Sequence, residues 1–145
     1  MKEFARGSLF DRLIDMDPYV LEASTTLKTL TLKELKESVK REIGWLLNTT
    51  CSFSQEELEG MERNCLNYGV HDFSCFFPDS SDNRSRLAKI VQNAIEAFEP
   101  RLKNTEVTVN EMSSNNDKFT LSILIDGELM INKISEPVSF IMAIE

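Results

Sequence analysis

The spacing of apolar residues changes once along this chain, close to residue 100. Before that point the clearest stripe recurs every three or four residues, as on one face of an amphipathic helix, and comprises Leu87, Ile90, Val91, Ala94, Ile95 and Phe98. After that point apolar residues alternate with polar ones, as they do in a strand that buries one face. Helices followed by successive alternating strands predict an α+β domain, with helices in the N-terminal two-thirds and an antiparallel β meander after them.

Two capping-box spacings predict the other main helices. The first, at Thr31, opens a helical pattern over 31–47. The second, at Ser54, predicts a short helix that continues through Leu66 and ends at Gly69.

The N-terminal segment has a shorter signal. Residues 8–14 predict a short helix with its apolar residues on one side, namely Leu9, Phe10, Leu13 and Ile14. Whether that side packs on the chain's own domain or on a partner stays open at this stage. We expect residues 1–30 to form a partly flexible arm and residues 31–145 to form one domain.

The alternating segments predict strands joined by hairpins. Asp126-Gly127 is a dipeptide typical of a two-residue hairpin turn, so we expect the chain to reverse there. A turn cluster at 113–117 separates the first two strands. The last alternating segment follows Pro137 and comes late in the hairpin order, so we expect it to lie at the edge of the sheet. Such an edge can accept a strand from another chain, and its alternating apolar residues include Val138, Phe140 and Met142.

Composition excludes several classes of partner. The net charge is −8, from 24 acidic and 16 basic residues, and the basic residues over 33–42 are interleaved with glutamates, as on a solvated helix face. This argues against a nucleic-acid or anionic-membrane surface, which needs clustered positive charge. No membrane span or signal-peptide pattern is evident, so we expect a cytoplasmic chain without direct membrane insertion.

The residue types that carry metal or catalytic chemistry form no convincing pattern. The three cysteines are an odd set, typical of reduced thiols, and the spacing of Cys51, Cys65, His71 and Cys75 lacks the short paired ligands of zinc sites. No glycine-rich phosphate loop is present. Glu99 has the most apolar neighbours of the acidic residues, but the nearby Arg101 favours its charged form, which opposes a general-acid role. We therefore expect no enzyme activity, no metal and no cofactor.

The segment Phe98-Glu99-Pro100-Arg101-Leu102 joins the last helix to the first strand. Proline ends the helix, and the apolar residues on either side anchor the corner in the core. We expect Glu99 and Arg101 to be held outward at a fixed angle, where the guanidinium can pair with a carboxylate or carbonyl of this chain or another. The alternative is that Arg101 only complements the negative end of the helix and Glu99 is solvated.

Four blocks in this order resemble the TssE family of type VI secretion baseplate subunits. They are Ser8-Leu9-Phe10-Asp11-Arg12-Leu13, the stretch from Leu35 to Thr49, the stretch from Leu66 to Ser74, and Phe98-Glu99-Pro100-Arg101-Leu102. That family is similar to the small baseplate wedge protein of contractile-tailed phages and is often labelled lysozyme-like. This chain departs from its pattern at Thr50, where an arginine is usual, and at His71, where a proline is common.

The resemblance implies a structural role. Glu99, Pro100 and Arg101 match the family motif that is thought to contact the wedge core of TssF and TssG. The family fold resembles the strand-exchanging part of the sheath subunit, which implies that the chain starts sheath polymerisation on a membrane-docked baseplate, with TssK and the TssB–TssC sheath as further partners. The alternatives are a lysozyme-like peptidoglycan hydrolase and a generic cytosolic adaptor. A secretion system, a phage tail and an extracellular contraction device all remain open as the machine.

Overall fold

The computed structural model describes residues 5–14, 29–72, 80–112, 120–131 and 134–144. The elements in chain order are β1 (Ala5–Arg6), α1 (Leu9–Leu13), β2 (Thr29–Leu30), α2 (Leu32–Leu47), β3 (Thr50–Cys51), α3 (Gln55–Glu59), the 3₁₀ helix η1 (Cys65–Asn67), β4 (Val70–His71), α4 (Ser81–Phe98), β5 (Leu102–Met112), β6 (Thr120–Ile131) and β7 (Ile134–Ile144). Within those ranges, no helix is both long enough and apolar enough to cross a membrane.

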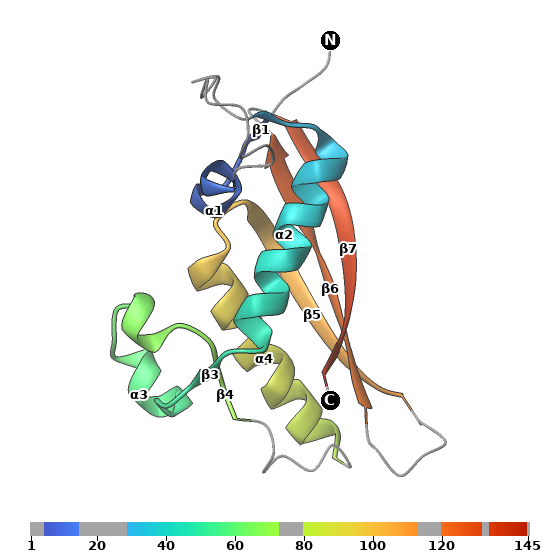
Figure 1. The fold of residues 1–145 in the computed structure, drawn as a ribbon. Coiled ribbons are helices and arrows are strands. Elements are labelled where there is room, and N and C mark those ends of the chain that lie inside the picture. Colours follow the sequence, from blue (N-terminus) through green and yellow to red (C-terminus); the bar gives the residue numbers. More distant parts are fainter. Residues whose placement is uncertain (1–4, 15–28, 73–79, 113–119, 132–133, 145) are drawn as a thin grey trace.

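Two layers make up the domain. The long helices α2 and α4 lie on one face of an antiparallel sheet with the strand order β5-β6-β7 (Figure 1). The predicted α+β class and the C-terminal meander are therefore confirmed.

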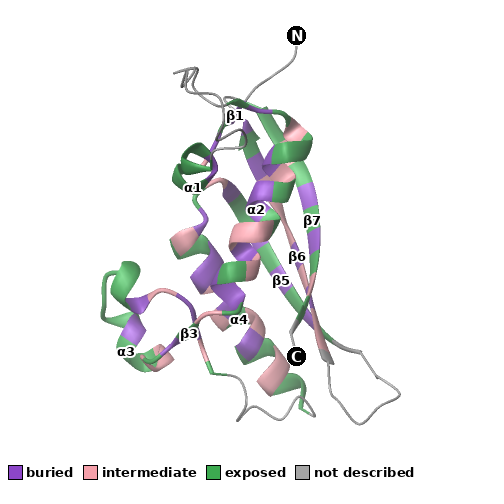
Figure 2. Ribbon diagram, in the orientation of Figure 1, coloured by how far each residue is buried: buried purple, intermediate pink, exposed green. Residues whose placement is uncertain are grey.

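The core lies between these layers (Figure 2). Its completely or almost completely buried side chains come from both helices and from the central strand β6, and include Leu35, Val39, Ile43, Val91, Ile95, Ile123, Ile125 and Leu129. Apolar area removed from water is the main stabilising contribution in a domain of this size. The helical and alternating periods in the sequence thus place their apolar residues against each other.

Helix α2 begins where its capping-box spacing predicts. Thr31 is the N-cap of α2, and its hydroxyl accepts from the backbone N–H of Glu34, whose carboxylate accepts in return from Thr31. Ser80 caps α4 in the same position, and Glu99 follows the last residue of that helix.

The predicted helix through Leu66 is wrong in its length. Helix α3 stops at Gly60, and a separate 3₁₀ turn follows at η1. Only Leu58 of α3 is buried, whereas Met61 and Leu66 are exposed, so no continuous apolar face extends the helix. Gly69 adopts a φ of 109° in the link to β4, where a Cβ would lie 2.3 Å from the carbonyl oxygen of Thr49.

The predicted turn at Asp126-Gly127 is also wrong. Both residues lie inside the continuous strand β6, opposite Ser139 and Val138 of β7. A Cβ at Gly127 would lie 2.9 Å from Cδ1 of Leu102, so glycine here permits a close approach of β5 instead of a turn.

The meander therefore contains three long strands instead of four short segments. The register of β5 on β6 shifts between Lys103 and Glu106, and Asn104, which has a φ of 51°, lies in this irregularity. The chain reverses between Ile131 and Ile134, and the turn cluster predicted at 113–117 lies outside the described residues.

The described part of the N-terminal arm lies against the domain. Strand β1 pairs with β2, and α1 lies beside α2 (Figure 1). The predicted short helix is confirmed. Its leucines are left largely exposed, with Leu9 65% and Leu13 73% exposed, whereas Asp11 is buried.

Candidate partner-binding site

The corner after α4 is turned inward, contrary to the prediction that its charged side chains are held out. Glu99 is only 3% exposed. Arg101 forms a bidentate pair with its carboxylate, in which Nε donates to Oε1 and Nη2 donates to Oε2, each at 2.8 Å. The alternative of a solvated Glu99 is wrong for the same reason, because the carboxylate is buried and paired.

Arg101 also ties this corner to α2. Its Nη1 donates to the hydroxyl of Ser38 at 3.0 Å, and its Nη2 donates to Oε2 of Glu42 at 2.9 Å. Burial alone lowers the pKa of Arg101, but its hydrogen bonds and charge pairing with Glu99 outweigh that effect, so the pKa is raised. The guanidinium is thus a permanent internal brace.

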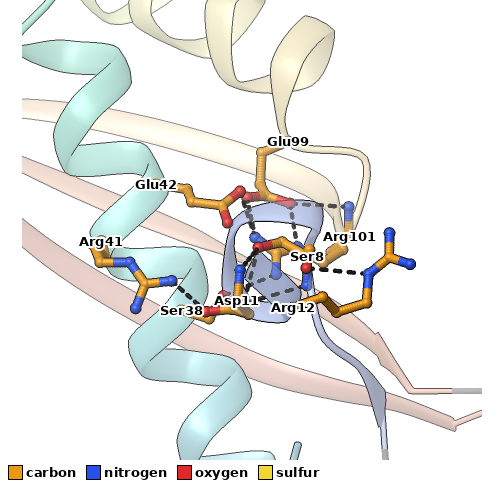
Figure 3. Close-up of polar contacts among 8 residues, drawn as sticks. All are labelled: Ser8, Asp11, Arg12, Ser38, Arg41, Glu42, Glu99 and Arg101. Atoms are coloured by element: carbon orange, nitrogen blue, oxygen red, sulfur yellow. Dashed lines mark hydrogen bonds and ion pairs between the residues drawn. The ribbon is translucent and has the colours of Figure 1, made fainter. Parts of the chain in front are cut away.

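Asp11 brings α1 into the same network (Figure 3). Ser38 donates its hydroxyl hydrogen to Oδ2 of Asp11 at 2.6 Å, and Arg41 pairs with Oδ1. Ser8 and Asp11 form the capping box of α1. Burial alone raises the pKa of Asp11, but the hydrogen bonds from Ser38, Arg41 and Ser8 outweigh it and hold that pKa well below its ordinary value.

A groove lies beside this network, between α1, α2 and the end of α4. Its volume is about 370 Å³, and we call it the α1 groove, lined by Ser8, Leu9, Phe10, Leu13, Glu42, Ile43, Trp45, Leu46, Tyr68, Phe98 and Glu99. The rings of Phe10 and Trp45 pack edge-on with centroids 4.7 Å apart, and the guanidinium of Arg41 lies over both rings. The groove is mostly apolar, with the two glutamates as its acidic part.

The predicted edge strand is at the edge of the described sheet. Strand β7 pairs with β6 on one side, and no described strand pairs with its other side. Val138 and Phe140 are buried toward the helices and Met142 packs against the core, so only backbone groups of β7 are left to pair with another chain at that edge.

The cysteine and histidine positions give no metal site among the described residues. Cys51 and His71 are partners in the parallel β3–β4 pair, and the buried Cys51 thiol contacts the carbonyl oxygen of Asn67 at 3.6 Å. Cys65 is exposed, and Cys75 lies outside the described residues. No three His, Cys, Asp or Glu side chains in the described ranges are placed to hold a metal ion together.

Comparison with known proteins assigns the family. Residues 33–133 match the family model of baseplate wedge protein gp25. The chain belongs to the baseplate wedge protein gp25 family. The resemblance to TssE, the gp25-like subunit of type VI secretion systems, is thereby confirmed, and a structural role in a baseplate is what this membership supports.

The fold agrees with this assignment. A chain of a solved structure titled "The baseplate complex from the type VI secretion system" superposes with a TM-score of 0.56 at 13% identity, covering 78% of this chain and 96% of that one. Among curated proteins, none matches this chain significantly. The gp25-family match contains α2, α4, β5 and β6 with the Glu99–Arg101 corner, whereas α1 and β7 lie outside the matched residues.

Sequence reasoning missed most of the residues that surround the corner formed by Glu99, Pro100 and Arg101. Ser38 and Glu42 contact Arg101 directly, from 63 and 59 positions earlier in the chain. Asp11 is linked to Arg101 through Ser38. No local spacing in the sequence therefore connects these residues. Trp45 packs against Phe10 and is 42% exposed at the rim of the α1 groove. The signal that was available is the capping-box spacing of Ser8 and Asp11, which predicts a helix start and says nothing of a partner.

Proposed function

We propose that this chain is a wedge subunit of a contractile injection machine, which binds the TssF–TssG wedge core through the helical side of the domain around Glu99, Pro100 and Arg101. The observation that carries the proposal is the gp25-family match over residues 33–133, which contains this corner. The geometry refines how the motif acts. Arg101 and Glu99 hold α2, α4 and α1 at fixed positions, so they present the surrounding surface instead of reaching for the partner themselves.

Co-purification of the full chain with its co-expressed TssF–TssG subunits tests this role. We expect a stable complex with the wild-type chain. Absence of binding by a folded wild-type chain contradicts the proposal. Peptidoglycan hydrolysis by the purified chain, abolished by one carboxylate substitution, favours the lysozyme-like alternative.

We also propose that β7 pairs with a strand of the TssB–TssC sheath and so starts sheath assembly. The support is its position at the edge of the described sheet, with backbone groups free for a further strand. We further propose that TssK is a partner and that the assembled chain lies at a baseplate docked on the membrane.

A photocrosslinking amino acid tests the sheath contact. Placed at Ile141, which is 66% exposed on β7, it should crosslink to a sheath subunit during assembly. The same amino acid at Leu66, which is 84% exposed on η1, is the matched control. Equal crosslinking from both positions, or none from Ile141, contradicts strand pairing at this edge.

A further inference from the structure

The α1 groove shows three features that the brace of Glu99 and Arg101 does not explain. The first is the orientation of α1, which buries its carboxylate and exposes its leucines. Leu9 is 65% exposed, Leu13 is 73% exposed and Phe10 is 46% exposed. Together with Trp45 they form a contiguous apolar rim along α1 and α2. Contiguous exposed apolar side chains of this kind mark interaction sites more often than isolated ones do.

The second feature is an unsatisfied acceptor in the same groove. Oε2 of Glu42 accepts from Arg101, but its Oε1 is buried and has no hydrogen-bond partner among the residues that the structure describes. A buried carboxylate oxygen without a donor is unfavourable, and such atoms in native proteins call for an explanation. The Glu42 side chain is 26% exposed and lines the groove, so a cation brought by a partner can lie beside this carboxylate and offset its charge.

The third feature is the sign of the charge inside the groove. The pKa of Tyr68 is raised by its own burial and then by the charges of Glu42 and Glu99. The Arg41 guanidinium nearby is paired with Asp11 and lies over aromatic rings. The groove therefore combines apolar walls with a negative acceptor, which is complementary to an apolar surface that carries one cation.

We propose that the α1 groove binds an amphipathic helix of a wedge subunit, which inserts apolar side chains against Leu13 and Trp45 and places one lysine or arginine beside the carboxylate of Glu42. A groove between helix ends with an apolar rim fits the helix-in-groove mode of recognition. The proposal rests on the proposed baseplate role and goes beyond it by naming the chemistry of the partner surface. It also assigns the contact to α1 and Glu42, with Arg101 as a positioning residue behind them.

The single tryptophan of the chain makes the groove directly observable, because Trp45 is at its rim. The full chain is labelled with 5-fluorotryptophan, and its ¹⁹F resonance is recorded with and without the unlabelled TssF–TssG complex. We expect the resonance to shift or broaden on binding. Binding without any change at Trp45 overturns the groove proposal while leaving the wedge role intact.

Two variants separate the apolar and the charged contributions. Leu13→Glu places a charge on the rim, and Leu66→Glu places the same charge on η1, at a leucine that is 84% exposed and does not line the α1 groove. We expect Leu13→Glu to weaken wedge binding roughly tenfold or more, and Leu66→Glu to bind like wild type. Glu42→Gln should weaken binding and reduce its dependence on salt, because the charge is lost while the shape is kept.

The remaining outcomes decide against the proposal. Equal binding by Leu13→Glu and wild type, or equal losses by Leu13→Glu and Leu66→Glu, overturns it. A dimer of the isolated chain that Leu13→Glu dissociates identifies a second copy as the occupant. Failure of the wild-type chain to bind the wedge at all overturns the proposed function itself.

Discussion

Removal of the Arg101 guanidinium should destabilise the fold far more than loss of an ordinary surface ion pair. Arg101→Met keeps most of the aliphatic stem and deletes four side-chain hydrogen bonds, two to Glu99 and one each to Ser38 and Glu42. Among the described residues, the carboxylate of Glu99, with a side chain only 4% exposed, then keeps only the backbone N–H of residue 101 as a donor.

The expected magnitude follows from that burial. Deleting one partner of a buried, hydrogen-bonded ion pair lowers the free energy of unfolding by about 3–5 kcal/mol, because the other charge stays buried without compensation. Arg101 itself is 18% exposed, so solvent screens the pair only weakly. The free energy of unfolding of a domain of this size is about 5–15 kcal/mol, so the variant should remain folded but lose a large part of its stability.

Urea unfolding followed by far-ultraviolet circular dichroism and by Trp45 fluorescence measures the loss. Lys36→Met is the matched control, since it removes an ion pair of 3.9 Å between side chains that are 37% and 40% exposed. That loss should stay below about 1 kcal/mol. The double variant Glu99→Gln with Arg101→Met should recover at least about 1 kcal/mol of the single loss, because no buried charge remains. Equal losses for Arg101→Met and Lys36→Met, or no recovery in the double variant, would refute the reasoning.

Two further predictions concern Asp11 and the glycines. The folded-state pKa of Asp11 is depressed, so its stabilisation is present above its ordinary pKa of 3.8 and is lost as the pH falls through the folded value. The stability difference between wild type and Asp11→Asn, measured by thermal unfolding, should therefore be constant above about pH 5 and shrink below pH 4; a difference independent of pH contradicts the network. Gly127→Ala should lower the free energy of unfolding by about 1–3 kcal/mol, because its Cβ meets Leu102 at 2.9 Å inside the sheet. In Gly44→Ala the new Cβ meets only the flexible end of Met142 at 3.3 Å, so its free energy of unfolding should stay within about 1 kcal/mol of wild type. Similar losses for the two variants would contradict a special need for glycine at position 127.

The main elements could be predicted because each signal is local. The capping box of Thr31 and Glu34 and the apolar stripe from Leu87 to Phe98 lie within one helix, and alternation lies within one strand. The blocks that resemble the TssE family are also local stretches, and the gp25-family match confirms what they indicate.

The site could be predicted only in part, because its decisive contacts are distant in the chain. Glu99, Pro100 and Arg101 were found from their own spacing, but their direction depends on Ser38 and Glu42 of α2. Once these acceptors are in place, a guanidinium is better satisfied inside the domain than in water, and the corner turns inward.

The sequence alone determined the helical and strand periods, the order of helices before strands and the family, because these depend on residues within a few turns or strand positions of each other. The tertiary structure alone decided that Asp126-Gly127 continues a strand against Leu102 and that α1 buries Asp11 and exposes its leucines. It also decided that Glu42, at the α1 groove, has one carboxylate oxygen without a hydrogen-bond partner among the described residues. Each of these outcomes is a balance between the local preference of a segment and the packing and hydrogen bonding that distant segments offer it, and only the folded chain brings those partners together.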